Sequence, residues 1–97
     1  MLSGMTRDQT AASFSGQSLQ PADAILIASD LKFMAVLTTL NLRDNSIGDD
    51  GAKAIAEALK VNPVLTKLFL LGNNMGDAGK KAVQDAVKGR SGFLLHL

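Results

Sequence analysis

An internal repeat restricts the possible folds of this chain more than any other feature of its sequence. Residues 37–64 align with residues 65–92 without a gap, so apolar residues, an asparagine, glycines and an aspartate recur at a constant spacing of 28. Repeats with a period of about 20 to 50 residues form solenoids, propellers or similar arrays, because each repeat buries its apolar face against the next. The aligned pairs are Leu37/Leu65, Leu40/Leu68, Leu42/Leu70, Asn45/Asn73, Ile47/Met75, Gly48/Gly76, Asp49/Asp77, Gly51/Gly79, Ala54/Ala82, Ile55/Val83, Ala58/Ala86 and Leu59/Val87.

The pattern continues more weakly on both sides of these two repeats. Counting back by one further repeat places Ala12 and Phe14 at the inward strand positions and residues 21–33 in a helix. At the other end, a closing strand fits best if Leu95 matches Leu68, at a spacing of 27. We therefore predict one domain over residues 1–97, made of a degenerate first repeat (9–36), two clear repeats (37–64 and 65–92) and a closing strand (93–97).

Each repeat is predicted to begin with a short strand. Leu40 and Leu42 are two residues apart, so they point to the same face of the strand and are expected to face the core. Thr39, Asn41 and Arg43 then point to the opposite face. The same alternation is expected in the next repeat and in the closing strand.

A turn is predicted after each strand. Asn45 stands where the strand ends, and its side-chain amide can bond backbone groups that the turn leaves unpaired. Gly48 is expected to permit a tight turn. Asp49 is expected to cap the following helix, because a carboxylate there meets free amide groups and the positive end of the helix dipole. The same roles are expected at the matching positions of the next repeat, for Asn73, Gly76 and Asp77.

A helix is predicted after each turn. The small residues on its apolar face are expected to let helix and strand approach closely. Pro63 ends the first of these helices, and Gly89 ends the next. The residues that share one helical face, at i, i+3, i+4, i+7 and i+8, are Gly51, Ala54, Ile55, Ala58 and Leu59.

When strands and helices alternate in this way, successive strands run parallel to each other, because each helix returns the chain to the edge of the sheet where the previous strand began. One repeat cannot bury its apolar face alone, so the repeats are expected to stack into a curved solenoid. The fold class is therefore α/β. We predict a short horseshoe segment with about four parallel strands on the concave side and three helices on the convex side.

The pattern L-x-x-L-x-L-x-x-N-x-I/M-G-D-x-G resembles the ribonuclease-inhibitor class of leucine-rich repeats, which also forms the sensor arrays of NOD-like receptors. The resemblance is specific over residues 37–88. The ending of the chain is similar to the terminal cap of short arrays of this class, so the array is expected to end there. The resemblance implies a horseshoe that binds proteins on its concave side, and it carries no catalytic residues.

Composition excludes several classes of function. Ten basic and nine acidic side chains leave a net charge of +1, which gives no electrostatic basis for binding nucleic acid. The absence of cysteine excludes disulfides and thiolate metal sites. No apolar run is long enough for a signal peptide or a membrane span. We therefore expect a cytoplasmic protein that binds neither nucleic acid nor membrane.

No motif for catalysis or for a cofactor is recognised. The acidic stretch 44–50 lacks the ligand spacing of an EF-hand loop, and the glycine-rich stretch 72–76 lacks the pattern of a phosphate-binding loop. His96 is the only histidine, so neither a zinc site nor a nucleophilic triad is indicated. We predict no catalytic residue, no cofactor, no metal and no small-molecule substrate.

Basic residues recur on the last predicted helix and just after it. Lys80, Lys81, Lys88 and Arg90 alternate with acidic residues, and the chain has no Tyr or Trp on which bases could stack. These four side chains are therefore expected to form a solvated helix face.

The outward strand positions carry the functional prediction. Three of these residues, Phe69, Leu71 and Leu94, are apolar where strand alternation predicts exposure, and exposed apolar patches commonly mark interaction sites. The predicted protein-binding residues on the concave face are Thr39, Asn41, Arg43, Lys67, Phe69, Leu71, Leu94 and His96.

Two interpretations of this patch stay open. In the first, an unknown protein partner binds it, and Phe69 and Leu71 anchor the contact. In the second, the patch is buried by residues 1–10 or by a second copy of the chain. A self-assembling structural protein could pair through this face or through the ends of the solenoid, where terminal repeats lack a neighbour.

Overall fold

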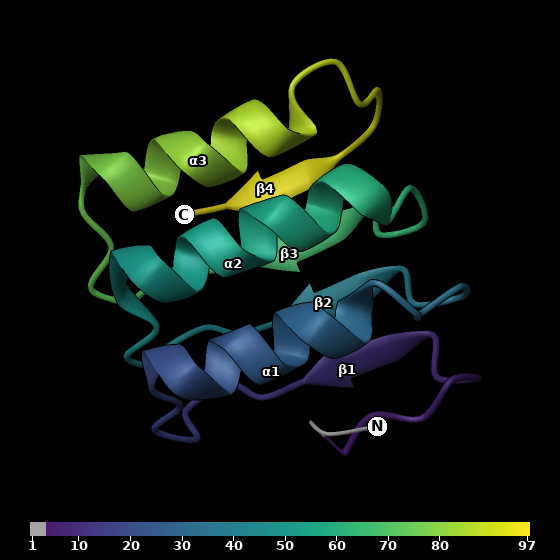
Figure 1. Cartoon of the computed structure of the whole chain (residues 1–97), viewed down its shortest axis with the longest axis horizontal. Helices are drawn as coiled ribbons and strands as arrows, with labels where there is room; N and C mark the ends of the chain where they lie inside the picture. Colours follow the sequence, from purple (N-terminus) through teal and green to yellow (C-terminus); the bar gives the residue numbers. More distant parts are fainter. Residues whose placement is uncertain (1–3) are drawn as a thin grey trace.

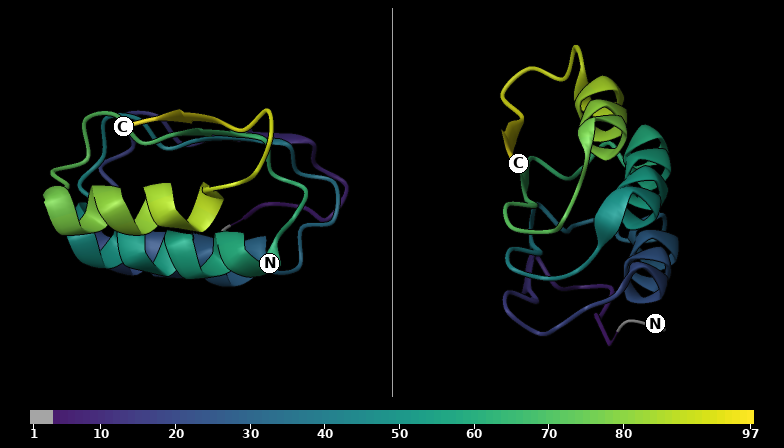
Figure 2. Two further views of the ribbon diagram at one scale, coloured as in Figure 1. Left: turned by 90° about the horizontal axis from the view of Figure 1, so that it is seen from above. Right: turned by 90° about the vertical axis from the view of Figure 1, so that its left-hand side faces the viewer.

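Two layers make up the protein, a four-stranded sheet and a row of three helices (Figure 1, Figure 2). The computed structural model describes residues 4–97, so residues 1–3 of the predicted domain lie outside the described residues. The predicted α/β class with four parallel strands and three helices is confirmed. The elements are β1 (Ala11–Ser13), α1 (Pro21–Leu31), β2 (Thr39–Asn41), α2 (Gly48–Val61), β3 (Lys67–Phe69), α3 (Asp77–Val87) and β4 (Leu94–His96).

The strands pair in chain order, β1-β2-β3-β4, and all three pairs are parallel. Ala12 pairs with Leu40 and Leu40 with Leu68, in each case one full repeat further along the chain. Leu68 then pairs with Leu95, at the predicted spacing of 27. The loss of one residue between the last helix and the closing strand is therefore confirmed.

The core lies between the sheet and the helices. The inward strand leucines and the apolar helix positions of the two clear repeats are buried or partly buried, as the periodicity predicts. Ala12 is also buried, whereas Phe14 is only partly covered. The large side chains that are fully buried are Leu31, Met34, Leu37, Leu40, Leu42, Ile47, Ile55, Leu59, Leu65, Leu68, Leu70 and Val83.

Two glycines set how closely neighbouring helices pack. A Cβ atom on Gly79 would lie 2.5 Å from Oδ1 and 3.1 Å from Cα of Asp49, and 3.2 Å from the Cβ of Ala52. A Cβ atom on Gly51 would meet Ile47 and the Cβ of Ala24. These two glycines therefore let helix approach helix, as the side-by-side row in Figure 1 illustrates, and the predicted helix-to-strand role is wrong for these two positions.

Only one of the two turn glycines adopts the conformation that requires glycine. Gly48 has a φ of +67°, in the left-handed region that side chains with a Cβ atom rarely adopt. Gly76 has a φ of −86°, so the prediction of the same role for it is wrong. At Gly76 a Cβ atom would instead lie 3.2 Å from Oδ2 of Asp49, so this position serves close packing.

Asp49 does cap a helix, but not the helix that contains it. Helix α2 begins at Gly48, so Asp49 lies inside its first turn, and Ile47 at the N-cap position makes no side-chain cap. The Oδ1 atom of Asp49 accepts hydrogen bonds from the backbone N–H groups of Gly76, at 2.7 Å, and Gly79, at 3.0 Å. Both donors lie at the N-terminus of α3, where amide groups lack partners within the helix.

The prediction for Asp77 also needs correction. Asp77 is the first residue of α3, and Gly76 occupies the N-cap position without a side-chain hydrogen bond. Because α3 is the last helix within residues 4–97, Asp77 has no following helix to cap. The cap on α3 therefore comes from the aspartate of the preceding repeat and not from its own.

Candidate protein-binding surface

The eight predicted binding residues lie on or directly after β2, β3 and β4. Pairing of the strands aligns Thr39 with Lys67 and Lys67 with Leu94. It aligns the second row in the same way, from Asn41 through Phe69 to His96. Arg43 and Leu71 follow the ends of β2 and β3. We call these eight residues the strand face; it is the side of the sheet opposite the helices (Figure 2).

Apolar side chains are exposed on the strand face. Leu71 is 45% exposed and Leu94 is 42% exposed. Phe69 is partly covered, and the ring of His96 meets it edge-on, with 4.9 Å between ring centroids and an interplanar angle of 88°. Edge-to-face pairs of this geometry are favourable, so the two rings hold each other in a defined orientation.

Polar and basic side chains surround these apolar groups. Lys67 and Arg43 are exposed, Thr39 and Asn41 are partly buried, and none of the eight residues is acidic. The Oδ1 atom of Asn41 accepts a hydrogen bond of 3.0 Å from the backbone N–H of Arg43, which fixes the Asn41 side chain. The strand face thus combines an aromatic pair and two leucines with positive charge.

The N-terminal segment does not cover the strand face over its described part. Met5 is buried in the core cluster, and the carbonyl oxygen of Thr10 accepts hydrogen bonds from the N–H and hydroxyl groups of Thr38. Residues 4–10 therefore lie at the end of the molecule formed by β1 and α1, far from β3 and β4 (Figure 1). The interpretation that residues 1–10 bury the patch is therefore wrong for residues 4–10, and residues 1–3 lie outside the described part of the chain.

Asn62, which the sequence did not single out, connects two repeats. Its Nδ2 atom donates to the carbonyl oxygens of Leu31 (2.7 Å) and Met34 (3.3 Å) in the preceding repeat. Its Oδ1 atom accepts from the N–H groups of Val64 (2.8 Å) and Leu65 (3.1 Å). The side chain is buried, so it satisfies backbone groups that water does not reach.

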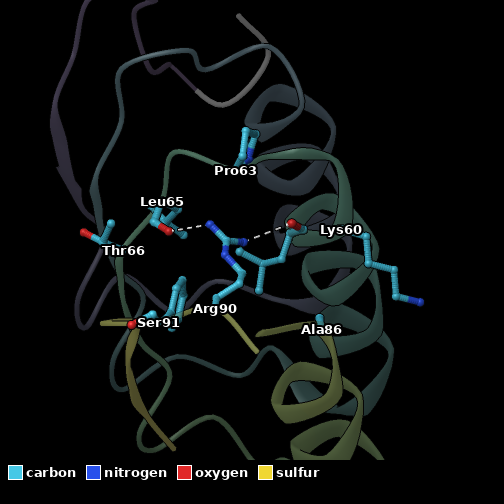
Figure 3. A pocket seen from close by; sticks show the side chains of 9 residues that line it. Lys60, Pro63, Leu65, Thr66, Ala86, Arg90 and Ser91 are labelled. Atoms are coloured by element: carbon cyan, nitrogen blue, oxygen red, sulfur yellow. Dashed lines mark hydrogen bonds between the residues drawn. The ribbon is translucent and has the colours of Figure 1, made fainter. Parts of the chain in front are cut away.

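Arg90 occupies the position of the next repeat that is equivalent to Asn62, and it also donates hydrogen bonds to backbone carbonyl oxygens (Figure 3). Its guanidinium group donates to the carbonyl oxygens of Leu59 (3.1 Å) and Leu65 (2.7 Å), and it lies 5.0 Å from the ring centroid of Phe93. The prediction that Arg90 belongs to a solvated helix face is therefore wrong. Because Asn and Arg differ in charge and length, the repeat gave no signal that the two positions are equivalent.

The other residues of that predicted basic face, Lys80, Lys81 and Lys88, are exposed, as predicted.

The polar stretches considered for ion binding build the turns. Asn45, in the acidic stretch, is buried, and its side-chain amide bonds backbone groups of the preceding repeat and of its own repeat. Asn73 donates to the carbonyl oxygens of Leu42 and Leu70. The predicted turn role of both asparagines is confirmed. Within residues 4–97, no group of three or more His, Cys, Asp or Glu side chains could hold a metal ion.

A family model supports the repeat. Residues 34–56 match the model described as Leucine Rich repeat, a segment that includes β2 and the first part of α2. No curated protein matches the chain. Among the helices of residues 4–97, none is both long enough and apolar enough to cross a membrane.

Leucine-rich repeats generally mediate binding between proteins and are typically not enzymes. The matched segment carries the inward leucines and the asparagine that fix the strand and the turn. The strands on either side pair with β2 in the register that the repeat predicts. The match, the four parallel strands and the three covering helices together support a leucine-rich repeat protein.

Proposed function

We propose that the chain is a non-enzymatic protein-binding module and that its partner binds the strand face. The observation that supports this most is the edge-to-face pair of Phe69 and His96, flanked by the exposed side chains of Leu71 and Leu94. An aromatic anchor within a patch that is ringed by polar groups has the composition of an interaction hot spot.

The charge of the strand face favours a partner with acidic side chains at the contact. Lys67 and Arg43 are exposed and no acidic residue belongs to the face. A partner with an apolar side chain flanked by Asp or Glu would gain favourable electrostatics as well as burial of Phe69 and Leu71. Rim charges of this kind mainly raise the association rate, so binding is expected to weaken as salt is raised.

The test uses a double substitution, Phe69→Asp and Leu71→Asp. Proteins captured from native lysate are identified, and binding of each purified candidate is then measured by calorimetry. A genuine partner should bind the double variant at least a hundredfold more weakly, which corresponds to about 2.8 kcal/mol at roughly tenfold per 1.4 kcal/mol.

A matched control places the same two charges on the helix layer. Ile25→Asp and Gln84→Asp change exposed side chains of α1 and α3, so this variant should keep full affinity. Circular dichroism checks that both variants stay folded. Equal affinity of the strand-face variant and the control would contradict the proposal.

Self-association is the second candidate function. Leu71 and Leu94 could be buried by a second copy of the chain, and Ile25 (49% exposed) and Leu26 (41% exposed) leave apolar surface on the first helix. Light scattering over a concentration series separates the candidates. A chain that stays monomeric at high concentration argues for a different protein as partner.

We further propose that the repeats belong to the ribonuclease-inhibitor class, with boundaries at 9–36, 37–64 and 65–92, and that the protein works in the cytoplasm. The constant spacing between paired positions of β1, β2 and β3, and the helix in every repeat, support the class. The absence of cysteine is consistent with a reducing compartment.

A further inference from the structure

A second exposed apolar surface lies where the helices end. Phe33 and Val61 occupy equivalent positions of successive repeats, just after α1 and at the last residue of α2. Phe33 is 67% exposed and Val61 is 60% exposed, the two highest values among the large apolar side chains of residues 4–97. Lysines precede both, at Lys32 and Lys60. We call these four residues, with the two grooves beside them, the helix-end edge.

Two grooves lie side by side along this edge. The first has a volume of about 270 Å³ and lies between the loop after α1 and the loop after α2, with Phe33, Val61 and Val64 among its walls. The second has a volume of about 570 Å³ and is lined by Leu59, Leu65 and Phe93 among others (Figure 3). Pro63 lines both grooves, so they form one continuous surface with a ridge between them.

One side chain in the wall of each groove is hydrogen-bonded to backbone carbonyl oxygens. In the first groove, the side chain of Asn62 donates hydrogen bonds to Leu31 O and Met34 O. In the second groove, the guanidinium group of Arg90 donates hydrogen bonds to Leu59 O and Leu65 O. Helix C-termini normally present free carbonyl oxygens and a negative dipole. Here Leu31 O and Leu59 O are already occupied, so the grooves do not repel an acidic ligand through these groups.

Three basic residues border the grooves, although the ammonium end of Lys60 points away from Arg90 in Figure 3. Lys32 lines the first groove and Lys60 and Arg90 line the second, and no acidic residue of the described chain lines either one. Lys60 is paired with Glu57 at 3.0 Å, but both side chains are more than half exposed. An exposed pair of this kind contributes little and exchanges easily for another carboxylate.

We propose that the helix-end edge binds an acidic peptide segment of a partner protein. Two apolar side chains of the segment occupy the two grooves on either side of Pro63, and its carboxylates pair with Lys32 and Lys60. An anionic bilayer would also attract lysines and an exposed Phe, but a flat lipid surface does not fill concave grooves. This proposal does not depend on the strand face, because no residue belongs to both surfaces.

The test uses fluorescein-labelled nine-residue peptides that consist of Asp and Glu with two Leu residues at every possible separation. Matched sets replace the acidic residues by Ser or by Lys. Fluorescence polarisation should select acidic peptides with a preferred leucine separation. Binding should weaken at least fivefold when salt is raised from 0.05 to 0.5 M, because screening reduces the attraction of exposed charges. Amide NMR shifts should locate the bound peptide at Val61, Val64 and Ser91.

The matched variants distinguish this surface from others. Phe33→Ser with Val61→Ser changes two exposed side chains and should weaken the selected peptide at least tenfold. Ile25→Ser with Leu26→Ser removes similar exposed apolar groups elsewhere on α1 and should leave binding unchanged. NMR spectra of both variants verify that they are folded.

Three results would overturn the proposal outright, and a fourth would move the peptide to another surface. The first three are the absence of any acidic peptide that binds at millimolar concentration, equal binding by the two variants, and binding only to phosphatidylserine vesicles. The last of these would assign the helix-end edge to a lipid surface. Loss of binding in the variant Phe69→Asp with Leu71→Asp, but not in Phe33→Ser with Val61→Ser, would place the peptide on the strand face instead.

Discussion

Buried asparagine side chains connect the repeats at the scale of single residues. Asn45 and Asn73 bond the loops of the repeats before them, and Asn62 does the same at the opposite edge of the sheet. Each side chain donates to carbonyl oxygens and accepts from N–H groups of the backbone, in its own repeat or in a neighbouring one. Polar residues can therefore occupy this core because their hydrogen bonds are fully used.

Substitution of Asn62 by alanine should be strongly destabilising. The change removes a partner from two carbonyl oxygens and two N–H groups, of which Leu31 O keeps its bond from the N–H of Met34. Each buried group that is left unsatisfied costs about 1 to 3 kcal/mol. Water that enters the space will recover part of this, so we expect a loss of about 3 kcal/mol in urea unfolding. Gln84→Ala on the exposed face of α3 is the control and should change stability by less than about 0.5 kcal/mol. A loss no larger than in the control would show that these bonds contribute little.

Prediction from sequence succeeded for Asn45 and Asn73 and failed for Asn62, for a physical reason. The two turn asparagines stand at equivalent positions after matching leucine patterns, so the repeat itself marks them. Asn62 acts on residues about one repeat earlier, and its counterpart is Arg90, a different residue with a similar set of acceptors. A role that depends on geometry between repeats, and is filled by different side chains, leaves no periodic signal.

At the scale of secondary-structure elements, one contact between α2 and α3 combines a helix cap with close helix packing. Asp49 on α2 caps α3, and the two donors are Gly76 and Gly79, where any Cβ atom would crowd the carboxylate. The glycines and the aspartate thus form one contact between two helices. The sequence showed all three residues as repeated positions, but it could not show that the aspartate of one repeat bonds the glycines of the next.

This contact predicts different effects for two equivalent aspartates. Asp49→Ala removes a helix cap and should lower stability by about 1.5 kcal/mol, within the range for capping residues. Asp77→Ala should lose only the interaction of an exposed carboxylate with the dipole of its own helix, about 0.5 kcal/mol. Thermal and urea unfolding of the two variants measures the difference. Equal losses would mean that the cap on α3 contributes nothing.

At the scale of the whole molecule, the outer face of α3 is polar where the equivalent face of α2 is apolar. Helix α2 presents the buried residues Ala52 and Ala56, whereas the equivalent positions on α3 are Lys80 and Gln84, both exposed. A terminal repeat with a polar outer face stays soluble without a neighbour. Within residues 4–97, α3 is the last helix of the layer, and the sheet has one more strand, β4, after it.

The closing strand β4 should stabilise the whole molecule, since its inner face completes the core. Phe93, Leu95 and Leu97 pack against the core cluster, and Leu70 N–H donates to His96 O. Burial of a large apolar side chain contributes about 1.5 to 3 kcal/mol when complete. Because the three side chains are partly buried, we expect a chain that ends at Gly92 to have a free energy of unfolding lower by roughly 3 kcal/mol. Urea unfolding should still show one transition, shifted to lower urea, because each repeat depends on its neighbour.

Point substitutions in β4 distinguish the contribution of its buried side chains from the effect of shortening the chain. Leu95→Ser, on the inner face of β4, should reproduce a large part of the loss, about 1 to 1.5 kcal/mol. Leu94→Ser, one residue earlier and 42% exposed on the strand face, should cost less than about 0.5 kcal/mol. If both substitutions cost the same, the alternation of β4 would not distinguish core from surface. Because the strand face and the core share this alternation, the same pair of variants also shows whether Leu94 is free for a partner.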